Sequence, residues 1–158
     1  QGIGVSTTIR ISQLSSRQQP KLLKRASVAS TQIVTIMVVV ISSFFLLFST
    51  TLPYLFTSST EVAKVATGLI IILVVFQIFD AIQIIFSGVL RGMADARVTG
   101  MLTLFSYFGV AIPISYLAAF KAGMGPAGIW LGFPIGLGLC AMLFYFRIKK
   151  MLIKPIRV

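Results

Sequence analysis

The stretch Val65-Ala-Thr-Gly-Leu-Ile-Ile-Ile-Leu-Val-Val-Phe-Gln-Ile-Phe79 is followed directly by Asp80 and then by a second apolar run that ends near Leu90. A membrane-crossing helix needs about 20 predominantly apolar residues, and the first run alone is too short. The segment therefore spans a bilayer only if Asp80 lies inside it. The sequence predicts a transmembrane helix over about residues 62–90 that carries one carboxyl group into the membrane.

Three more stretches without charged residues, 26–60, 98–120 and 122–146, reach or exceed the length of a membrane span. With 57% hydrophobic and 11% charged residues and a mean hydropathy of +1.00, the composition lies outside the range of soluble domains. The runs are continuously apolar rather than alternating, which favours helices over a β-barrel. We predict an all-α polytopic transmembrane bundle, with a partial helix over residues 1–16 and complete spans over 26–52, 62–90, 98–120 and 126–147.

The connections between these spans are short, so we expect neighbouring helices to pack antiparallel in one membrane domain covering residues 1–158. Gln1 is not a start methionine and Gly2 to Ser12 has the pattern of a helix already under way, so we expect further residues upstream. The single cysteine, Cys140, and the lack of histidine argue against disulfides, zinc sites and Ser-His-Asp chemistry in this sequence.

The basic residues predict the orientation of the spans. If successive loops lie on opposite sides of the membrane, 12 of the 14 Lys and Arg residues lie on one side, and Lys64 and Lys121 lie on the other. Basic residues concentrate on the cytoplasmic side, so we predict a cytoplasmic C-terminus. The net charge of +11 also suits nucleic-acid binding, but the basic tail has no interleaved aromatic residues for stacking bases. We therefore expect no nucleic-acid partner.

Asp80 shares one face of its helix with other polar residues. At about 100° per residue, this polar stripe covers roughly a third of the helix circumference and consists of Gln77, Asp80, Gln83, Ser87 and Arg91. A carboxylate inside a span costs about 2.5 to 3.5 kcal/mol, so the stripe must line a watery cavity or meet polar groups on other helices. Asp80 then either joins helices as a hydrogen-bonded carboxyl, or binds and releases a cation, H⁺ or Na⁺, with Gln and Ser oxygens as further Na⁺ ligands.

Small residues and prolines distinguish two other spans. Glycines repeat at a spacing of four at Gly128, Gly132 and Gly136, which lets another helix of this chain or of a second copy approach closely. Pro113 and Pro134 each remove a backbone hydrogen bond. We expect a bend in the helix at each proline.

The most distinctive block is Gln77-Ile-Phe-Asp80-Ala-Ile-Gln83, continuing through Ser87-Gly88-Val-Leu-Arg91-Gly92-Met-Ala-Asp95-Ala-Arg97. This block resembles the multidrug and toxic compound extrusion (MATE) family, in particular its NorM-like bacterial branch. The resemblance extends over nearly the whole chain, through Gly2-Ile-Gly4, Thr8-Ile-Arg10-Ile-Ser12-Gln13, Tyr107, Pro113-Ile-Ser-Tyr116 and Gly125-Pro-Ala-Gly128-Ile-Trp130-Leu-Gly132.

The resemblance implies half of a two-lobe transporter in the bacterial inner membrane. This chain would form most of the C-terminal lobe, four complete spans plus the end of a fifth, and its main partner would be a missing N-terminal lobe. The family exports amphipathic, often cationic drugs in exchange for Na⁺ or H⁺, with no other cofactor, by alternating between inward-open and outward-open states.

The resemblance also assigns roles to residues. Asp80 matches the cation-coupling acid on the family's tenth helix, whose acidic partner on helix seven lies outside this sequence; Gln77, Gln83 and Ser87 would support it. Phe76 stands where some relatives have tyrosine.

Phe76 and Tyr107 are therefore candidates for lining the transport cavity. Arg91, Asp95 and Arg97 match the family's cytoplasmic loop, where an orienting salt bridge with a structural or gating role is expected rather than a substrate site.

Three alternatives to a cation-driven drug antiporter stay open. A flippase for lipids or lipid-linked saccharides would be expected to have long basic grooves, and the spans contain no Lys and no interior Arg beyond Arg10. An intramembrane aspartyl enzyme needs two facing carboxylates, and one is present, so we expect no enzyme. A non-transporting scaffold would have no use for the polar stripe around Asp80.

Overall fold

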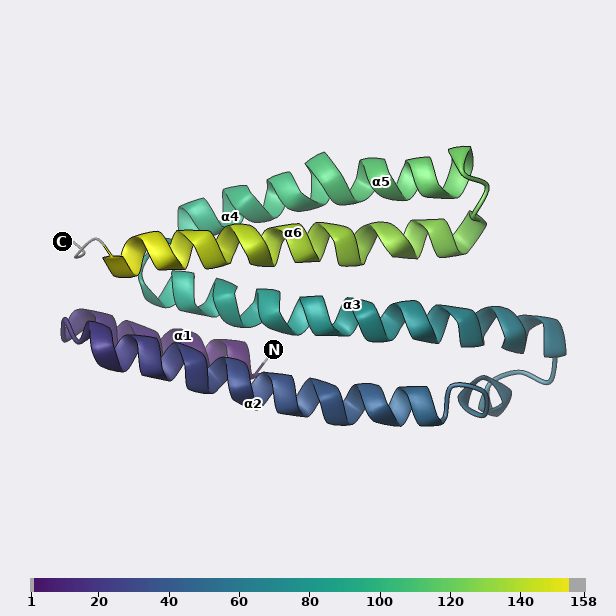
Figure 1. Cartoon of the computed structure of the whole chain (residues 1–158), viewed down its shortest axis with the longest axis horizontal. Coiled ribbons are helices and arrows are strands. Elements are labelled where there is room, and N and C mark those ends of the chain that lie inside the picture. Colours follow the sequence, from purple (N-terminus) through teal and green to yellow (C-terminus); the bar gives the residue numbers. More distant parts are fainter. Residues whose placement is uncertain (1, 154–158) are drawn as a thin grey trace.

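Helices of very different length run roughly along one common axis (Figure 1). The computed structural model describes residues 2–153, and this range contains no β-strand. The elements are α1 (Gly2–Ser16), α2 (Pro20–Leu47), a short 3₁₀ helix η1 (Leu52–Leu55), α3 (Thr60–Gly92), α4 (Ala96–Leu104), η2 (Phe105–Ala111), α5 (Ile112–Tyr116), η3 (Leu117–Lys121) and α6 (Gly125–Ile153).

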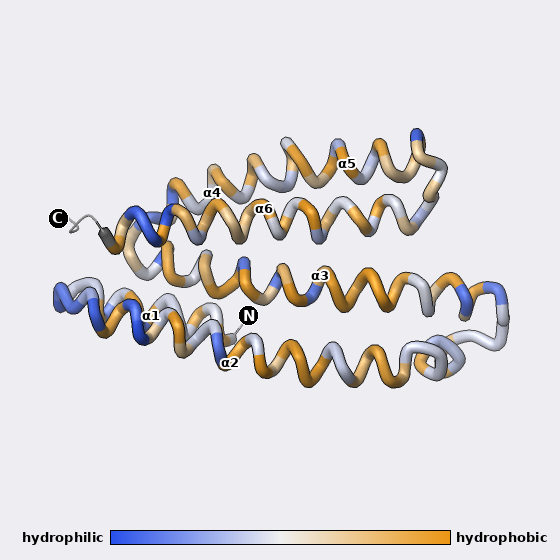
Figure 2. Tube along the Cα trace, viewed as in Figure 1, coloured by the Kyte–Doolittle hydropathy of each residue, from blue (hydrophilic) through white to orange (hydrophobic). Residues whose placement is uncertain are grey.

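Four helical stretches within residues 2–153 are long and apolar enough to cross a membrane. They are Pro20–Leu47, Thr60–Gly92, Ala96–Lys121 and Gly125–Leu152. Figure 2 shows apolar residues along the middle of these stretches and hydrophilic residues gathered at the ends of the bundle. The predicted fold class, an all-α bundle with four spans, is therefore confirmed.

The boundaries of the second helix differ from the prediction. We expected a span over 26–52, whereas α2 begins at Pro20 and ends at Leu47. Proline suits the first turn of a helix because the N–H that it lacks would be unpaired there in any case. The charge-free run marks the apolar part of the helix and not its whole length, since Lys21, Lys24 and Arg25 belong to its first two turns.

α3 is the central element of the bundle. It packs against α1 and α2 on one side and against α6 on the other (Figure 1). The Ser59 side chain accepts a hydrogen bond from the Val62 N–H at 3.5 Å and so caps the start of α3. Glu61 in the first turn and Arg91 in the last turn complement the helix dipole.

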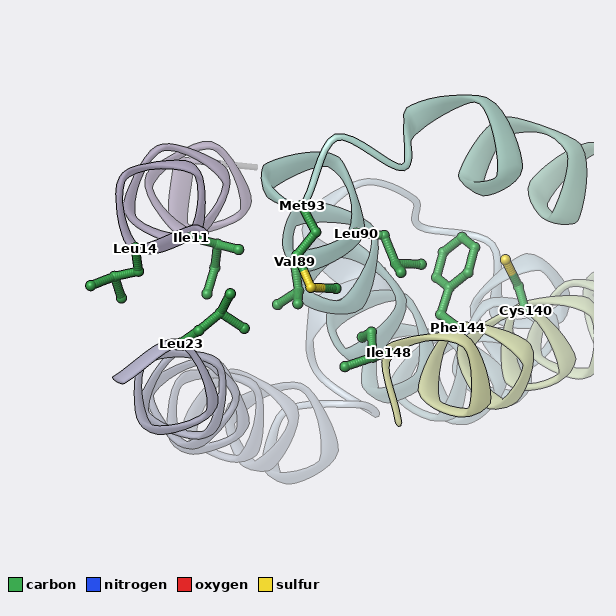
Figure 3. Packing of buried hydrophobic residues seen from close by; sticks show 9 residues of the cluster. All are labelled: Ile11, Leu14, Leu23, Val89, Leu90, Met93, Cys140, Phe144 and Ile148. Atoms are coloured by element: carbon green, nitrogen blue, oxygen red, sulfur yellow. The ribbon is translucent and has the colours of Figure 1, made fainter. Parts of the chain in front are cut away.

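The buried apolar core lies where α1, α2, α3 and α6 meet near one end of the bundle (Figure 3). It consists of Ile11, Leu14, Leu23, Val89, Leu90, Met93, Cys140, Phe144 and Ile148. Many large apolar side chains elsewhere are exposed, including Leu47 and Phe56 at 78% and 88%. So much exposed apolar surface is expected of helices that face lipid.

Pro113 is accommodated by a change of helix type. The predicted span 98–120 is a continuous helical rod, Ala96–Lys121, in which η2 and η3 are π-helical. The N–H of Ile112 donates to the carbonyl of Tyr107, five residues earlier, so the helix is already widened where Pro113 offers no N–H. Pro134 lies inside α6 and does not end it.

α6 approaches this rod closely through its repeated glycines, Gly128, Gly132 and Gly136. A Cβ atom at Gly128 would lie 2.5 Å from the backbone nitrogen of Ala119, and one at Gly136 would lie 2.5 Å from the Cβ of Ala111. The glycine repeat therefore packs two helices of the same chain, which was one of its two predicted uses.

We expect Gly132→Ala in the full-length protein to lower the free energy of unfolding by about 1–3 kcal/mol. The added methyl group would collide with Ser115 Oγ and the Ala111 carbonyl. Gly68→Ala on α3 is the matched control, since no atom lies within 4 Å of its Cβ position. Alanine favours a helix over glycine by up to about 1 kcal/mol, so the control should be neutral or stabilising. Thermal unfolding in detergent compares the two; an equal effect would contradict the close packing.

Candidate functional site

The polar stripe of α3 is divided by burial into two parts. Gln77 and Asp80 are half-buried, whereas Gln83 and Ser87 are only 9% and 5% exposed. None of the side-chain hydrogen bonds or ion pairs formed within residues 2–153 involves the Asp80 carboxylate. Asp80 is thus the charged member of the stripe that has no hydrogen-bond or ion-pair partner in this part of the chain.

Gln83 is linked to two other helices through the thiol of Cys140. Its Nε2 donates to Cys140 Sγ on α6 at 3.8 Å, and the Cys140 thiol lies 4.0 Å from Thr103 Oγ1 on α4. Sulfur is a weak donor and acceptor, so each contact is modest. Together they connect α3, α6 and α4 by polar groups. This contact was not predicted from the sequence, where Cys140 was considered only as a metal or disulfide residue.

Ser87 and Arg91 are hydrogen-bonded to each other within α3. Arg91 Nη2 donates to Ser87 Oγ at 2.7 Å, one turn away. Arg91 also borders a cavity of about 230 Å³ between α1 and α3, beside Thr8. α1 packs tightly over this part of the stripe, because a Cβ at Gly88 would lie 2.8 Å from the carbonyl oxygen of Gly4.

The two aromatic candidates have different surroundings. The Phe76 ring packs edge-to-face against Phe133 of α6, with ring centroids 6.3 Å apart. Tyr107 on η2 is half-buried, and its hydroxyl group lies within electrostatic range of the Asp80 carboxylate without a hydrogen bond to it. Tyr107 therefore lies in the same region as Asp80, whereas Phe76 contributes to the packing of α3 against α6.

The groups around Asp80 suit a proton or a small hard cation. Gln77 and Gln83 carry amide oxygens about one turn on either side of it, and the Tyr107 hydroxyl lies within electrostatic range. Residues 2–153 contain no group of three or more His, Cys, Asp or Glu side chains that could hold a metal ion. A Na⁺ ion at Asp80 would thus take amide, hydroxyl or carbonyl oxygens as its other ligands from this part of the chain.

The connection from α3 to α4 positions a second carboxylate. Ala94 adopts the left-handed conformation with a φ of 62°, and the Asp95 N–H donates to the Leu90 carbonyl at 3.0 Å, as in a Schellman motif. Arg147 of α6 then donates to both carboxylate oxygens of Asp95, from Nε at 2.7 Å and from Nη2 at 3.2 Å. This bidentate pair fastens the α3–α4 connection to α6.

The expected salt bridge in this connection is therefore present at Asp95, but neither Arg91 nor Arg97 is its partner. Arg97 is exposed and forms no ion pair within residues 2–153. Arg147 had been assigned only to the basic tail. It is the first charged residue after the apolar run of α6, at the same end of the bundle as Asp95, and this position was the available signal.

The MatE family model matches residues 1–117, which include the whole polar stripe and the α3–α4 connection. The chain belongs to the MatE family. Its helices therefore form part of a multi-pass membrane protein.

Bacterial relatives agree with this assignment. The chain is 33% identical over 149 residues to a probable multidrug resistance protein NorM from Xanthomonas axonopodis pv. citri (strain 306), covering 94% of this chain and 32% of the relative. It is 31% identical over 157 residues to the multidrug resistance protein MdtK from Yersinia pseudotuberculosis serotype O:1b (strain IP 31758), covering 97% and 34%. The chain thus spans about a third of the length of these relatives.

Solved structures show the same arrangement of helices. The eukaryotic MATE transporter AtDTX14 matches with a TM-score of 0.85 at 25% identity, over 93% of this chain and 33% of that one. Inward-facing and outward-facing conformations of a multidrug resistance MATE family transporter each match with a TM-score of 0.84 at 19% identity, over 94% and 34%. The last two likenesses concern the fold alone.

We expect a double-mutant cycle with Asp95→Ala and Arg147→Ala to give a coupling energy of about 1 kcal/mol in the unfolding of the full-length protein. The Asp95 side chain is only 12% exposed and the geometry is bidentate, but Arg147 is 32% exposed and partly screened by water. Lys150→Ala on the exposed end of α6 is the control, and its effect on unfolding should be additive with that of Asp95→Ala. Additive effects of Asp95→Ala and Arg147→Ala would show that the pair contributes nothing.

Proposed function

We propose that this chain is part of a secondary multidrug exporter in which binding of Na⁺ or H⁺ at Asp80 drives the export of amphipathic, cationic drugs. The observation that carries this proposal is the position of Asp80. It lies inside a membrane span and has no hydrogen-bond or ion-pair partner within residues 2–153, whereas Asp95 is paired with Arg147. A carboxylate in a membrane needs a partner, and an exchangeable cation supplies one.

The names of the relatives support drugs as the transported class. The bacterial relatives are called multidrug resistance proteins, and the solved structures include a multidrug resistance MATE family transporter. Methionine and aromatic side chains can accept varied apolar molecules, and a carboxylate attracts their positive charge. The other partners in this proposal are the lipid bilayer and an N-terminal lobe outside this chain; the coupling ion is the only cofactor.

Coupling requires that cation and drug favour different states of the transporter. This unit resembles the inward-facing and the outward-facing structures equally, with a TM-score of 0.84 for each. That equality supports a lobe that moves largely as one body while its relation to the other lobe changes. In this proposal, cation binding at Asp80 reorganises the side of α3 that faces away from α2 and weakens drug binding there.

We further propose that the C-terminus is cytoplasmic. Support comes from the basic residues, which concentrate at the end of the bundle that contains the start of α2 and the end of α6 (Figure 2). The bacterial relatives suit an inner-membrane location. The Asp95–Arg147 pair then lies on the cytoplasmic side, where it would hold the α3–α4 connection while the lobe moves, with Arg91 and Arg97 beside it.

Asp80→Asn in the full-length protein is expected to reduce cation-driven drug efflux from vesicles to the background level, because the amide cannot exchange a proton and carries no charge for Na⁺. Glu61→Gln at the start of α3 removes another acidic group from the same helix and serves as the control that retains efflux. Size-exclusion profiles show whether both variants insert and fold. Undiminished efflux by a folded Asp80→Asn protein would refute the assignment of Asp80.

The coupling ion is identified by imposing Na⁺ and H⁺ gradients separately on vesicles that contain the full-length protein and a fluorescent cationic drug. We expect one gradient alone to drive uptake against the drug gradient, and Asp80→Asn to remove that component. Equal transport without either gradient would contradict secondary active transport.

A further inference from the structure

A second cavity lies on the opposite side of α3 from the polar stripe. It has a volume of about 580 Å³ and is bordered by α2, α3 and α6, with Phe86, Val89, Tyr145 and Ile148 among its mainly apolar walls. At about 100° per residue, Phe86 and Val89 point on average about 150° away from the Asp80 stripe around the axis of α3. This groove is therefore separate from the proposed cation site.

One end of the groove is strongly basic. Lys24 of α2 borders the cavity together with Leu152 near the end of α6, so these two helix ends lie at the same end of the groove. Lys21 lies about one turn from Lys24, and Lys149 and Lys150 lie on the last turns of α6, all exposed. Asp95, which lies at this end, is already paired with Arg147. An anionic group is the complementary ligand for this end of the groove.

The rest of the groove suits a hydrocarbon chain. The hydroxyl groups of Ser27, Thr31 and Thr35 donate to carbonyls of their own helix at 2.9, 2.9 and 2.8 Å, so these polar side chains need no donor partner from a ligand. Tyr145 is 52% exposed, and its ring lies 6.2 Å from that of Phe86. A tyrosine near the end of a membrane span is typical of the level of the lipid headgroups.

We infer that this groove is a binding site for an anionic phospholipid. The lipid phosphate lies at Lys24 and Lys21, and one acyl chain lies between α2 and α6 on Phe86 and Val89. Basic pockets between transmembrane helices recognise anionic lipids by this combination of a charged rim and an apolar interior. The site is independent of the transport function proposed above, because it uses the other face of α3.

The competing occupant is a protein segment from outside this chain. Gln32 also borders the groove, and its amide makes no hydrogen bond within residues 2–153. A polar residue of another helix would give Gln32 a partner, whereas an acyl chain would not. Two observations favour the lipid. The lysines lie at one end of the groove, and the wall hydroxyl groups of Ser27, Thr31 and Thr35 already donate hydrogen bonds within α2.

Retention of lipid by the purified full-length protein tests the site. The protein is equilibrated with phosphatidylglycerol and phosphatidylcholine in detergent, and bound lipid is measured by native mass spectrometry. Lys21→Ala and Lys24→Ala should each lower phosphatidylglycerol retention about fivefold, the equivalent of about 1 kcal/mol per basic residue. Lys64→Ala and Lys121→Ala at the opposite end of the bundle are the matched controls and should leave it unchanged.

Two further variants separate the groove from its rim. Thr31→Trp fills the groove without altering charge, and it should remove the retention of phosphatidylglycerol in a protein that still elutes as a folded species. Thr31→Cys in a Cys140→Ser background should react more slowly with a membrane-soluble maleimide when phosphatidylglycerol is bound than in phosphatidylcholine alone. Unchanged preference for phosphatidylglycerol in Lys24→Ala or in Thr31→Trp would overturn the inference, and so would labelling of Thr31→Cys that does not change when phosphatidylglycerol is added.

Discussion

The requirement that every polar group inside a membrane find a partner within the protein shapes this bundle around α3. Within residues 2–153, α3 is the span that carries a carboxylate at mid-length, and it is also the helix against which α1, α2 and α6 pack. Gln83 finds its partner on α6, and Ser87 finds its partner in Arg91. The central position of α3 follows from this stripe, because a helix with a polar face cannot be placed at the edge of a bundle in contact with lipid on all sides.

Close approach of the neighbouring helices makes these partnerships possible. Gly88 and Gly92 bring α1 against α3, and the glycines of α6 bring the rod from α4 to η3 within reach. Without a strong hydrophobic force between helices in lipid, such contacts depend on van der Waals packing and on interhelical polar groups. The π-helical turns have the same effect locally, since they absorb Pro113 and keep the rod continuous along α6.

Length and charge were enough to predict the spans, because a bilayer sets how many apolar residues a helix needs. They did not predict where α2 begins, since helical hydrogen bonding continues from Pro20 through basic residues outside the apolar stretch. Helical periodicity placed Gln77, Asp80, Gln83 and Ser87 on one face, but which of them meets another helix depends on tertiary packing. The Arg147 partner of Asp95 and the Cys140 partner of Gln83 are 52 and 57 residues away in sequence, and no local pattern indicates such pairs.

Polar contacts with other helices hold α3 near its C-terminal end, and Asp80 lies before them along the same face of the helix. Gln83–Cys140–Thr103 and Asp95–Arg147 both tie α3 or the turn after it to α6, and the second pair also fixes the start of α4. Asp80 lies beyond these ties, where its carboxylate has Tyr107 nearby and no hydrogen-bond partner within residues 2–153. A cation bound at Asp80, as proposed, would change the charge on a stretch of α3 whose contacts with α6 within residues 2–153 are aromatic and apolar, as between Phe76 and Phe133, and not polar.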